Sequence, residues 1–169
     1  MDAIYLISGV DGQTLWRLGG KHSDFDQDFH FSRQHDARVR SENSTTMEIS
    51  FLENGFNGTH ISNATAETSS LLVVALDLVS SPMRAKLQQR YLRPDKKQSF
   101  ARGNAQMLGN GNILGGWGDA AYISEHTSDG EVVRGTQHGE SGATYLRSAR
   151  TYLHLTLYTP ATTNILISQ

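Results

Sequence analysis

The sequence predicts an all-β protein, a partial β-propeller of about two to three four-stranded blades. Residues 103–135 support this most directly. Gly109-Asn110-Gly111 supplies the positive φ angles of a tight β-hairpin, and Ser128-Asp129-Gly130 marks a second turn. The apolar segments between these turns have the length of strands, so the region has the pattern of one antiparallel blade.

Other short apolar segments predict strands earlier in the chain. Residues 3–8 and 13–18 form a hairpin around Asp11-Gly12. Residues 34–40 are short and alternating, and residues 47–52 form a strand that ends at the turn Glu53-Asn54-Gly55. We interpret these segments as strands of the same kind of antiparallel blade.

The remaining segments divide into loops and further strands. Residues 19–31 are polar and aromatic, and residues 56–70 are rich in Asn, Thr, Ser and Gly, so both are predicted to be loops. Residues 71–78 have the pattern of a buried strand. Residues 85–92 fit a strand or a short helix, and we take the strand because of the hairpin context. Residues 144–150 open a further blade.

An internal repeat supports this organisation. Residues 31–38 (FSRQHDAR) can be laid over residues 100–106 (FARGNAQ), and each copy is followed by strand-like residues and an acidic glycine turn. A repeated unit of this kind favours a repeat architecture. The alignment puts His35 and Asn104 at equivalent points of two blades, on the first and innermost strand of each.

Composition excludes several classes of protein. The chain has 169 residues, enough for one sizeable core, and a net charge of −2, which argues against nucleic acid or an anionic membrane as a partner. Without cysteine it has no disulfide, zinc ribbon or cysteine nucleophile. No segment has the length of a transmembrane helix, and the first residues lack the pattern of a signal peptide.

Four segments carry a family likeness: IYLISGVDGQTLWRLGGKHSDF, FSRQHDARVR, ISFLENG and GNAQMLGNGNILGGWGDAAYISEHTSDGEVV. In this order they resemble the arylsulfotransferase-like family of fungal proteins, over roughly residues 3–150, so residues 1–150 are expected to form one partial propeller domain. The resemblance implies a β-propeller, six-bladed in bacterial relatives, with a ligand site at its central channel. A whole propeller needs more chain, so the sequence corresponds to a partial one. Residues 151–169 diverge from the family and are expected to be a separate tail.

The resemblance also implies an activity, the transfer of a sulfuryl group between a phenolic sulfate ester and a phenol through a channel histidine. No nucleotide donor or other cofactor is implied. This chemistry needs a nucleophile of moderate basicity, cations for the sulfonate oxygens and an acid for the leaving phenoxide. The small-molecule partner would be the phenolic sulfate or the phenol.

The QHDAR segment supplies the candidate catalytic residues, His35 and Arg38. Histidine titrates near neutral pH, and the planar guanidinium of arginine matches tetrahedral oxyanions. Asp36 and Asn104 are the candidate substrate-binding residues, and Asp36 can also orient a histidine. Three residues apart, His35 and Arg38 lie on opposite faces of a regular strand, so both reach one site only near a strand end or a bulge.

A structural interpretation of the same residues stays open. In it, His35 is a hydrogen-bonding residue that ties one blade to the next, and Asp36 and Arg38 form an ion pair between blades. The protein is then a non-catalytic binding or scaffold module, or an inactive truncated member of the family. In either case, an open propeller leaves strand edges unpaired, so we expect self-association through exposed edges.

The other histidines and the sequons carry weaker signals. His126 and His138 are expected at the surface or in loops, and no pair of histidines has the spacing of a zinc site, so no metal is predicted. Asn43, Asn57 and Asn63 each begin a glycosylation sequon. The sequons and the resemblance favour a secreted protein, but the absence of a signal peptide leaves the location open.

Overall fold

A computed structural model of the chain describes residues 2–55, 65–137 and 163–168. Apart from a one-turn 3₁₀ helix, η2 (Gly118–Ala120), the regular structure of these residues is all β. The strands are β1 (Ala3–Ser8), β2 (Thr14–Gly19), β3 (Phe25–Gln27), β4 (Gln34–Glu42), β5 (Thr46–Glu53), β6 (Ser70–Asp77), β7 (Met83–Leu92), β8 (Asn104–Met107), β9 (Ile113–Gly116), β10 (Tyr122–His126), β11 (Val132–Gln137) and β12 (Thr163–Ser168). The prediction of an all-β chain is confirmed.

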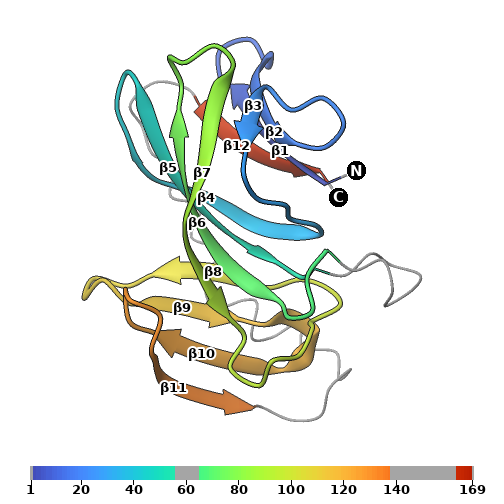
Figure 1. The fold of residues 1–169 in the computed structure, drawn as a ribbon, viewed down its shortest axis with the longest axis vertical. Coiled ribbons are helices and arrows are strands. Elements are labelled where there is room, and N and C mark those ends of the chain that lie inside the picture. The colour runs from blue at the N-terminus through green and yellow to red at the C-terminus, as the bar shows by residue number, and fades with distance from the viewer. Residues whose placement is uncertain (1, 56–64, 138–162, 169) are drawn as a thin grey trace.

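The strands form three sheets, and the second sheet lies between the first and the third (Figure 1). The first sheet has the order β12-β1-β2, the second β3-β7-β6-β5-β4 and the third β11-β10-β9-β8. Within the second and third sheets, β4 to β7 and β8 to β11 are antiparallel meanders. Each meander has four strands, as expected for a blade.

The turns of the third sheet lie where the sequence predicts them. Gly111 has a φ of 86° in the β8–β9 turn, and Gly130 has a φ of 97° in the β10–β11 turn. A left-handed backbone is available to glycine at little steric cost, so these residues allow the chain to reverse within a few residues. The strand interpretation of residues 85–92 is also confirmed, because they belong to β7.

The segment of residues 19–31 differs from its prediction as a loop. Within it, Phe25–Gln27 forms β3, which pairs in parallel with β7 at the edge of the second sheet. The burial of Phe25 explains why: its ring packs edge-on against Trp16 at a centroid distance of 5.3 Å. A three-residue strand in a polar segment has too little periodicity to be recognised from sequence.

Two apolar clusters hold the three sheets together. The faces of the first and second sheets share one cluster, which includes Leu18, Phe51 and Leu72. The second and third sheets share the other, which includes Leu52, Leu71 and Trp117. Phe51 and Leu52 are neighbours on β5, so successive side chains of one strand enter opposite clusters. The central strands of the second sheet, β5 and β6, are therefore buried on both faces.

The first strands of the two meanders lie next to each other. Strand β12 contacts β4, and β4 contacts β8, as the inner strands of neighbouring blades would. The predicted tail of residues 151–169 contains β12, which pairs with β1, whereas the boundary at residue 150 and the predicted blade at 144–150 lie outside the described residues. The sheets do not close into a ring within the described residues, so the propeller stays a prediction.

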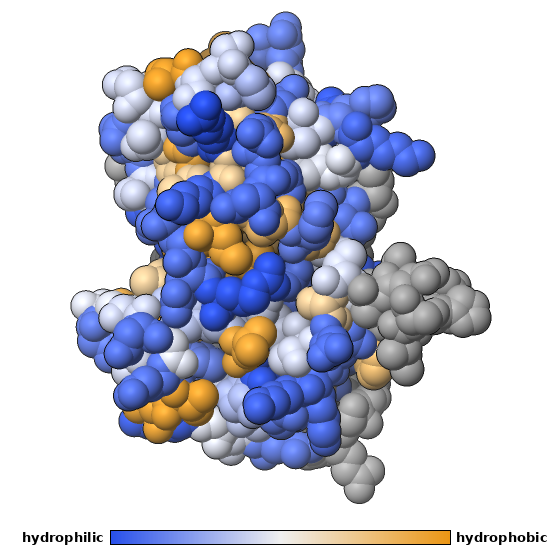
Figure 2. Space-filling model, in the orientation of Figure 1, coloured by the Kyte–Doolittle hydropathy of each residue, from blue (hydrophilic) through white to orange (hydrophobic). Residues whose placement is uncertain are grey.

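Apolar side chains on the surface are dispersed. Figure 2 shows separate small apolar patches among polar residues on the face in view. The most exposed large apolar residues of the described chain are Val10, Leu15, Val39, Val79, Leu92, Phe100, Val132 and Val133. No helix among the described residues is long and apolar enough to span a membrane. The edge strands of the three sheets in the described residues are β2 and β12, β3 and β4, and β8 and β11. Self-association through edges stays a prediction.

The shared core predicts a large difference between two leucines. Leu72 is fully buried on β6, whereas Leu15 on β2 is 55 % exposed. We expect Leu72→Ala to lower the free energy of unfolding by about 2–5 kcal/mol because it leaves a cavity between two sheets. Leu15→Ala, the matched control, should change it by no more than about 0.5 kcal/mol. Urea denaturation measures both, and equal effects would contradict the burial of β6.

Candidate functional site

The candidate site lies at the start of β4, where a β-bulge interrupts the pairing with β5. The register shifts between His35 and Arg38, and Asp36 has a left-handed backbone with a φ of 55°. Residues three apart lie on opposite faces of a regular strand, but the extra residue of a bulge brings them to the same face. The bulge that His35 and Arg38 need in order to reach one site is therefore present.

His35 is tied to the loop that precedes β8. The backbone N–H of Arg102 donates to His35 Nε2 at 3.1 Å. Burial lowers the pKa of His35, and the charge of Arg33 acts in the same direction, whereas the nearby Asn54 side chain and the charge of Asp36 oppose this shift. A neutral imidazole that accepts at Nε2 carries its proton on Nδ1. His35 is therefore held in its neutral form.

Asp36 and Arg38 form an ion pair within β4. Nε and Nη2 of Arg38 each lie 2.9 Å from Asp36 Oδ1. Asp36 Oδ2 accepts a hydrogen bond from the backbone N–H of Ala105 at 3.2 Å. The ion pair thus lies within one strand rather than between blades, and it is the backbone hydrogen bond that crosses to the third sheet. The guanidinium remains partly exposed, at 29 % of the side chain.

Arg40 also joins β4 to β8, and it is not among the residues predicted from sequence. Its Nε donates to Ser50 Oγ at 2.6 Å, and its Nη2 donates to the Ala105 carbonyl at 2.9 Å. Burial, together with the charge of Arg38, lowers the pKa of Arg40 to about 10, although the carboxylates of Asp36 and Glu48 oppose this shift. Two arginines and two carboxylates therefore share the face of the second sheet that packs against β8.

Asn104 does not join this group. Its neighbour Ala105 is buried in the cluster between the second and third sheets, so Asn104 points to the other face of the third sheet. A Cβ atom at Gly116 would lie 2.2 Å from Asn104 Oδ1, which shows that the amide covers this glycine. The structure places His35 and Asn104 on the first strands of their meanders, but brings only His35, Asp36 and Arg38 together. A substrate contact for Asn104 stays a prediction.

Of the three predicted glycosylation sequons, the described residues include only the one at Asn43. Asn43 is exposed in the β4–β5 turn, and its Oδ1 accepts hydrogen bonds from the backbone N–H groups of Thr45 and Thr46, each at 2.9 Å. Asn57 and Asn63 lie outside the described residues. Glycosylation stays a prediction for all three.

The expectation that His126 lies at the surface or in a loop is wrong. It lies on β10 and is 1 % exposed, in contact with the rings of Tyr91 and Trp117. Ser124 Oγ accepts a hydrogen bond from Trp117 Nε1 at 2.7 Å and lies 2.9 Å from His126 Nε2. Alternation along β10 pairs Ser124 with His126 on one face, but only the packed third sheet buries this polar chain. His138 lies outside the described residues.

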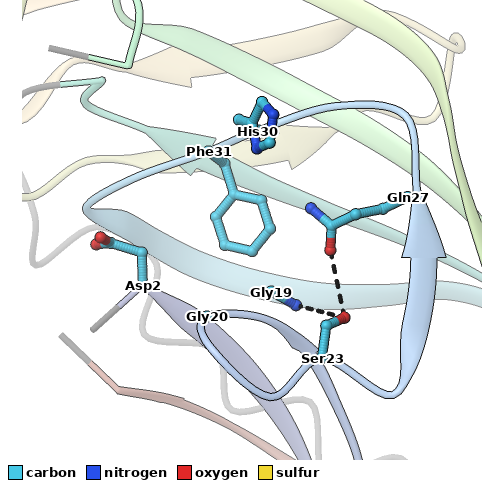
Figure 3. Close-up of a pocket in the computed structure, with 7 residues that line it drawn as sticks. All are labelled: Asp2, Gly19, Gly20, Ser23, Gln27, His30 and Phe31. Atoms are coloured by element: carbon cyan, nitrogen blue, oxygen red, sulfur yellow. Dashed lines mark hydrogen bonds between the residues drawn. The ribbon is translucent and has the colours of Figure 1, made fainter.

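A pocket of about 220 Å³ lies elsewhere, beside the end of β2 (Figure 3). Its polar groups maintain the shape of the loop: Ser23 Oγ accepts the Gly19 N–H at 3.2 Å, and Asp2 Oδ1 accepts the Arg33 N–H at 2.8 Å. Phe31 lies in the middle of the lining residues and is almost fully buried. None of the predicted site residues lines this pocket. The chemical groups at β4 therefore define the candidate site better than the pocket does.

The β4 cluster combines groups suited to oxyanion chemistry. The neutral imidazole of His35 can take up a proton. The partly exposed guanidinium of Arg38 can pair with an anion, and the Arg102 N–H can donate a hydrogen bond to a developing negative charge. Among residues 2–55, 65–137 and 163–168, no three histidine or carboxylate side chains are grouped to hold a metal ion.

Comparison with known proteins points to one family. The family model described as arylsulfotransferase (ASST) matches residues 1–139, which include β1 to β11. No curated protein and no solved structure is significantly similar to the chain.

The lowered pKa of His35 predicts a pH dependence of stability. A group whose pKa is depressed on folding stabilises the fold above its ordinary pKa, here 6.5, and loses this contribution as the pH falls through the lowered value. We therefore expect the free energy of unfolding to fall as the pH is lowered below about 7.5, and to fall less in His35→Gln. Glutamine can accept the Arg102 hydrogen bond but does not titrate. Urea denaturation at several pH values tests this, and equal slopes for the two proteins would contradict it.

The buried chain on β10 predicts a second effect on stability. Ser124→Ala leaves Trp117 Nε1 and His126 Nε2 without their hydrogen-bond partner, so the free energy of unfolding should fall by about 1–3 kcal/mol for each buried polar atom left unpaired. Ser128→Ala, in the exposed turn that follows β10, is the matched control and should have an effect of about 0.5 kcal/mol or less. A neutral Ser124→Ala variant would show that the chain is not formed.

Proposed function

Because the chain belongs to the arylsulfotransferase family, we propose that it transfers a sulfuryl group from a phenolic sulfate ester to a phenol at the start of β4. The match of the family over residues 1–139 is the observation that carries this proposal. The β4 cluster supports it because a neutral imidazole and a guanidinium lie in one contact network.

The proposed reaction has two halves. In the first, His35 attacks the sulfur, a nitrogen–sulfur bond forms, and the sulfur–oxygen bond to the donor phenol breaks; the phenoxide leaves with the electron pair and takes up a proton. In the second, an acceptor phenol loses its proton, its oxygen attacks the sulfur, and the nitrogen–sulfur bond breaks. The imidazole is restored, and no oxidant, reductant or cofactor is consumed.

The contacts of His35 suggest where the sulfonate binds. The lone pair of Nε2 is directed at the Arg102 N–H, so the sulfur must enter between these two groups for the attack to occur. The N–H is then available to donate to a sulfonate oxygen, and the partly exposed Arg38 guanidinium can pair with the remaining charge. Asp36 orients the site by holding Arg38 and the Ala105 N–H at once.

The position of the cluster agrees with a propeller channel. In this proposal the three sheets are consecutive blades, and β12, β4 and β8 are their inner strands, supported by their serial contacts. His35 is then on an inner strand, where the channel of a propeller gathers side chains from several blades.

One observation favours a second candidate function, a non-catalytic module in which His35 is structural. Nε2 of His35 already accepts the Arg102 N–H, and Asp36 already accepts the Ala105 N–H. Both hydrogen bonds join β4 to the third sheet. In this function the QHDAR segment ties neighbouring blades together, and the Arg102 hydrogen bond is never released.

Turnover of 4-nitrophenyl sulfate with phenol as the acceptor distinguishes the two functions. If His35 is the nucleophile, His35→Gln should remain folded, because glutamine can accept the Arg102 hydrogen bond, and should lose activity by about 100-fold or more. Arg38→Lys should lose less, since it keeps the positive charge but loses the planar fork. Circular dichroism verifies that each variant is folded.

Each outcome decides between the candidates. An active wild-type protein with an inactive, folded His35→Gln variant supports the transferase. Equal turnover by both proteins refutes the catalytic role of His35. A folded wild-type protein without turnover supports the non-catalytic module.

A further inference from the structure

Left-handed backbone is concentrated around His35. Five non-glycine residues of the described chain have a positive φ, and three of them lie around this histidine: Arg33, Asp36 and Arg102. The φ of Arg33 is 49° and that of Arg102 is 64°. Such a backbone is costly for a residue with a side chain, and it occurs most often at active sites and ligand clamps. The internal repeat aligns Arg33 with Arg102, so both meanders are preceded by an arginine in the same strained conformation.

A single residue, Asn54, holds the two arginines next to each other. Its backbone N–H donates to the Arg33 carbonyl at 3.2 Å, and its Nδ2 donates to the Arg102 carbonyl at 3.1 Å. Asn54 directly follows β5 and is fully buried, so this anchor has a defined position. Residues 33 and 102 therefore lie close together in space although they are far apart in the sequence.

The N–H groups of the two arginines are held as well. That of Arg33 donates to Asp2 Oδ1 at 2.8 Å. That of Arg102 donates to His35 Nε2 at 3.1 Å. Each arginine thus has both main-chain polar groups in hydrogen bonds, and these contacts fix the two main chains beside the imidazole.

The side chains of Arg33 and Arg102 are exposed, in contrast to their fixed main chains. Within the described part of the chain, no hydrogen bond or ion pair involves the Arg102 guanidinium. The charge of Arg33 acts on the imidazole of His35 and lowers its pKa. The guanidinium of Arg38, by contrast, is shared with the carboxylate of Asp36. Arg33 and Arg102 therefore bring positive charge to His35 in addition to that of the Asp36–Arg38 pair.

We propose that Arg33 and Arg102 form a clamp that binds a tetrahedral sulfur oxyanion at His35, either free sulfate or the sulfate group of an ester. The planar fork of a guanidinium matches two oxygens of such an anion, and the two forks come from the segments before β4 and β8. The left-handed backbone, anchored by Asn54, sets the points from which both side chains start. The catalytic meaning of the clamp rests on the proposed function, whereas the binding of free sulfate does not.

Glycine substitutions separate the side chains from the backbone that carries them. Glycine adopts a left-handed φ without steric cost, so Arg33→Gly and Arg102→Gly should fold, keep their main-chain hydrogen bonds and lose only the guanidinium. Lys96→Gly is the matched control. Lys96 is exposed, has a φ of 55° and carries the same charge, but its N–H donates to the Arg93 carbonyl at 2.9 Å rather than to His35.

The experiment is a titration with sodium sulfate at constant ionic strength, followed by the ring resonances of His35 in NMR spectra. These resonances are identified by their loss in His35→Gln. The wild-type protein and Lys96→Gly should show the same saturable shift. Arg33→Gly and Arg102→Gly should each bind sulfate about 10-fold more weakly or worse, because each loses a charged hydrogen-bonding group. Arg102→Lys, which keeps the charge without the planar fork, should have an intermediate affinity.

Three outcomes would overturn the proposal. They are the absence of a saturable shift in the wild-type protein, an equal shift with sodium chloride, and unchanged sulfate affinity in folded Arg102→Gly or Arg102→Lys. Circular dichroism verifies that each variant is folded.

Turnover distinguishes failure of the clamp from failure of the proposed function. Where the wild-type protein turns over 4-nitrophenyl sulfate, free sulfate should compete with the ester. Arg102→Gly should then raise KM by the same factor as the Kd for sulfate, since the clamp binds the ester and the free anion through the same group. Sulfate binding without turnover refutes the proposed transferase and supports the clamp. Turnover without sulfate binding refutes the clamp and leaves the transferase standing.

Discussion

The left-handed conformation of Asp36 is the constraint on which the candidate site depends. A non-glycine residue in this region costs roughly 1–2 kcal/mol, and less for aspartate than for most residues. The contacts of its carboxylate, with Arg38 on the same strand and with the Ala105 N–H on β8, offset this cost. Without the bulge, His35 and Arg38 would lie on opposite faces of β4. The site is therefore a product of the packing between two sheets as much as of one strand.

The two interfaces of the second sheet differ in their polar chemistry. Towards the third sheet, His35, Asp36 and Arg40 each contact the backbone of residues 102–105. Towards the first sheet lies Glu53, fully buried, with hydrogen bonds to Ser70 and Arg90. Burial raises the pKa of Glu53, although Arg90 opposes the shift.

This difference has a functional consequence. The two guanidinium groups are similarly exposed, at 29 % of the Arg38 side chain and 27 % of the Arg90 side chain. The carboxylates differ, because Asp36 is 22 % exposed whereas Glu53 has no exposure. Only the cluster towards the third sheet contains His35, the group on which the proposed sulfuryl transfer depends. The same contacts couple that chemistry to the docking of the third sheet.

The strands and tight turns of this protein could be predicted from sequence because their signals are local. The turn at Gly109-Asn110-Gly111, the hairpin at Asp11-Gly12 and the buried strand at 71–78 each depend on residues within about ten positions of one another. The QHDAR segment was also identifiable, together with the family that it resembles. The short strand β3 was missed because the strand with which it pairs, β7, lies far along the chain.

The sequence by itself determined the all-β class, the hairpins, the family and the residue types of the candidate site. Only the tertiary structure decided which of these residues meet. It turned Asn104 to the opposite face of the third sheet, buried His126 beside Trp117, and added Arg40 and Asn54 to the surroundings of His35. The physical reason is that hydrogen bonds between sheets join residues about fifty to seventy positions apart. The bulge in β4 also changes which of its residues share a face. No periodicity along one strand records such contacts.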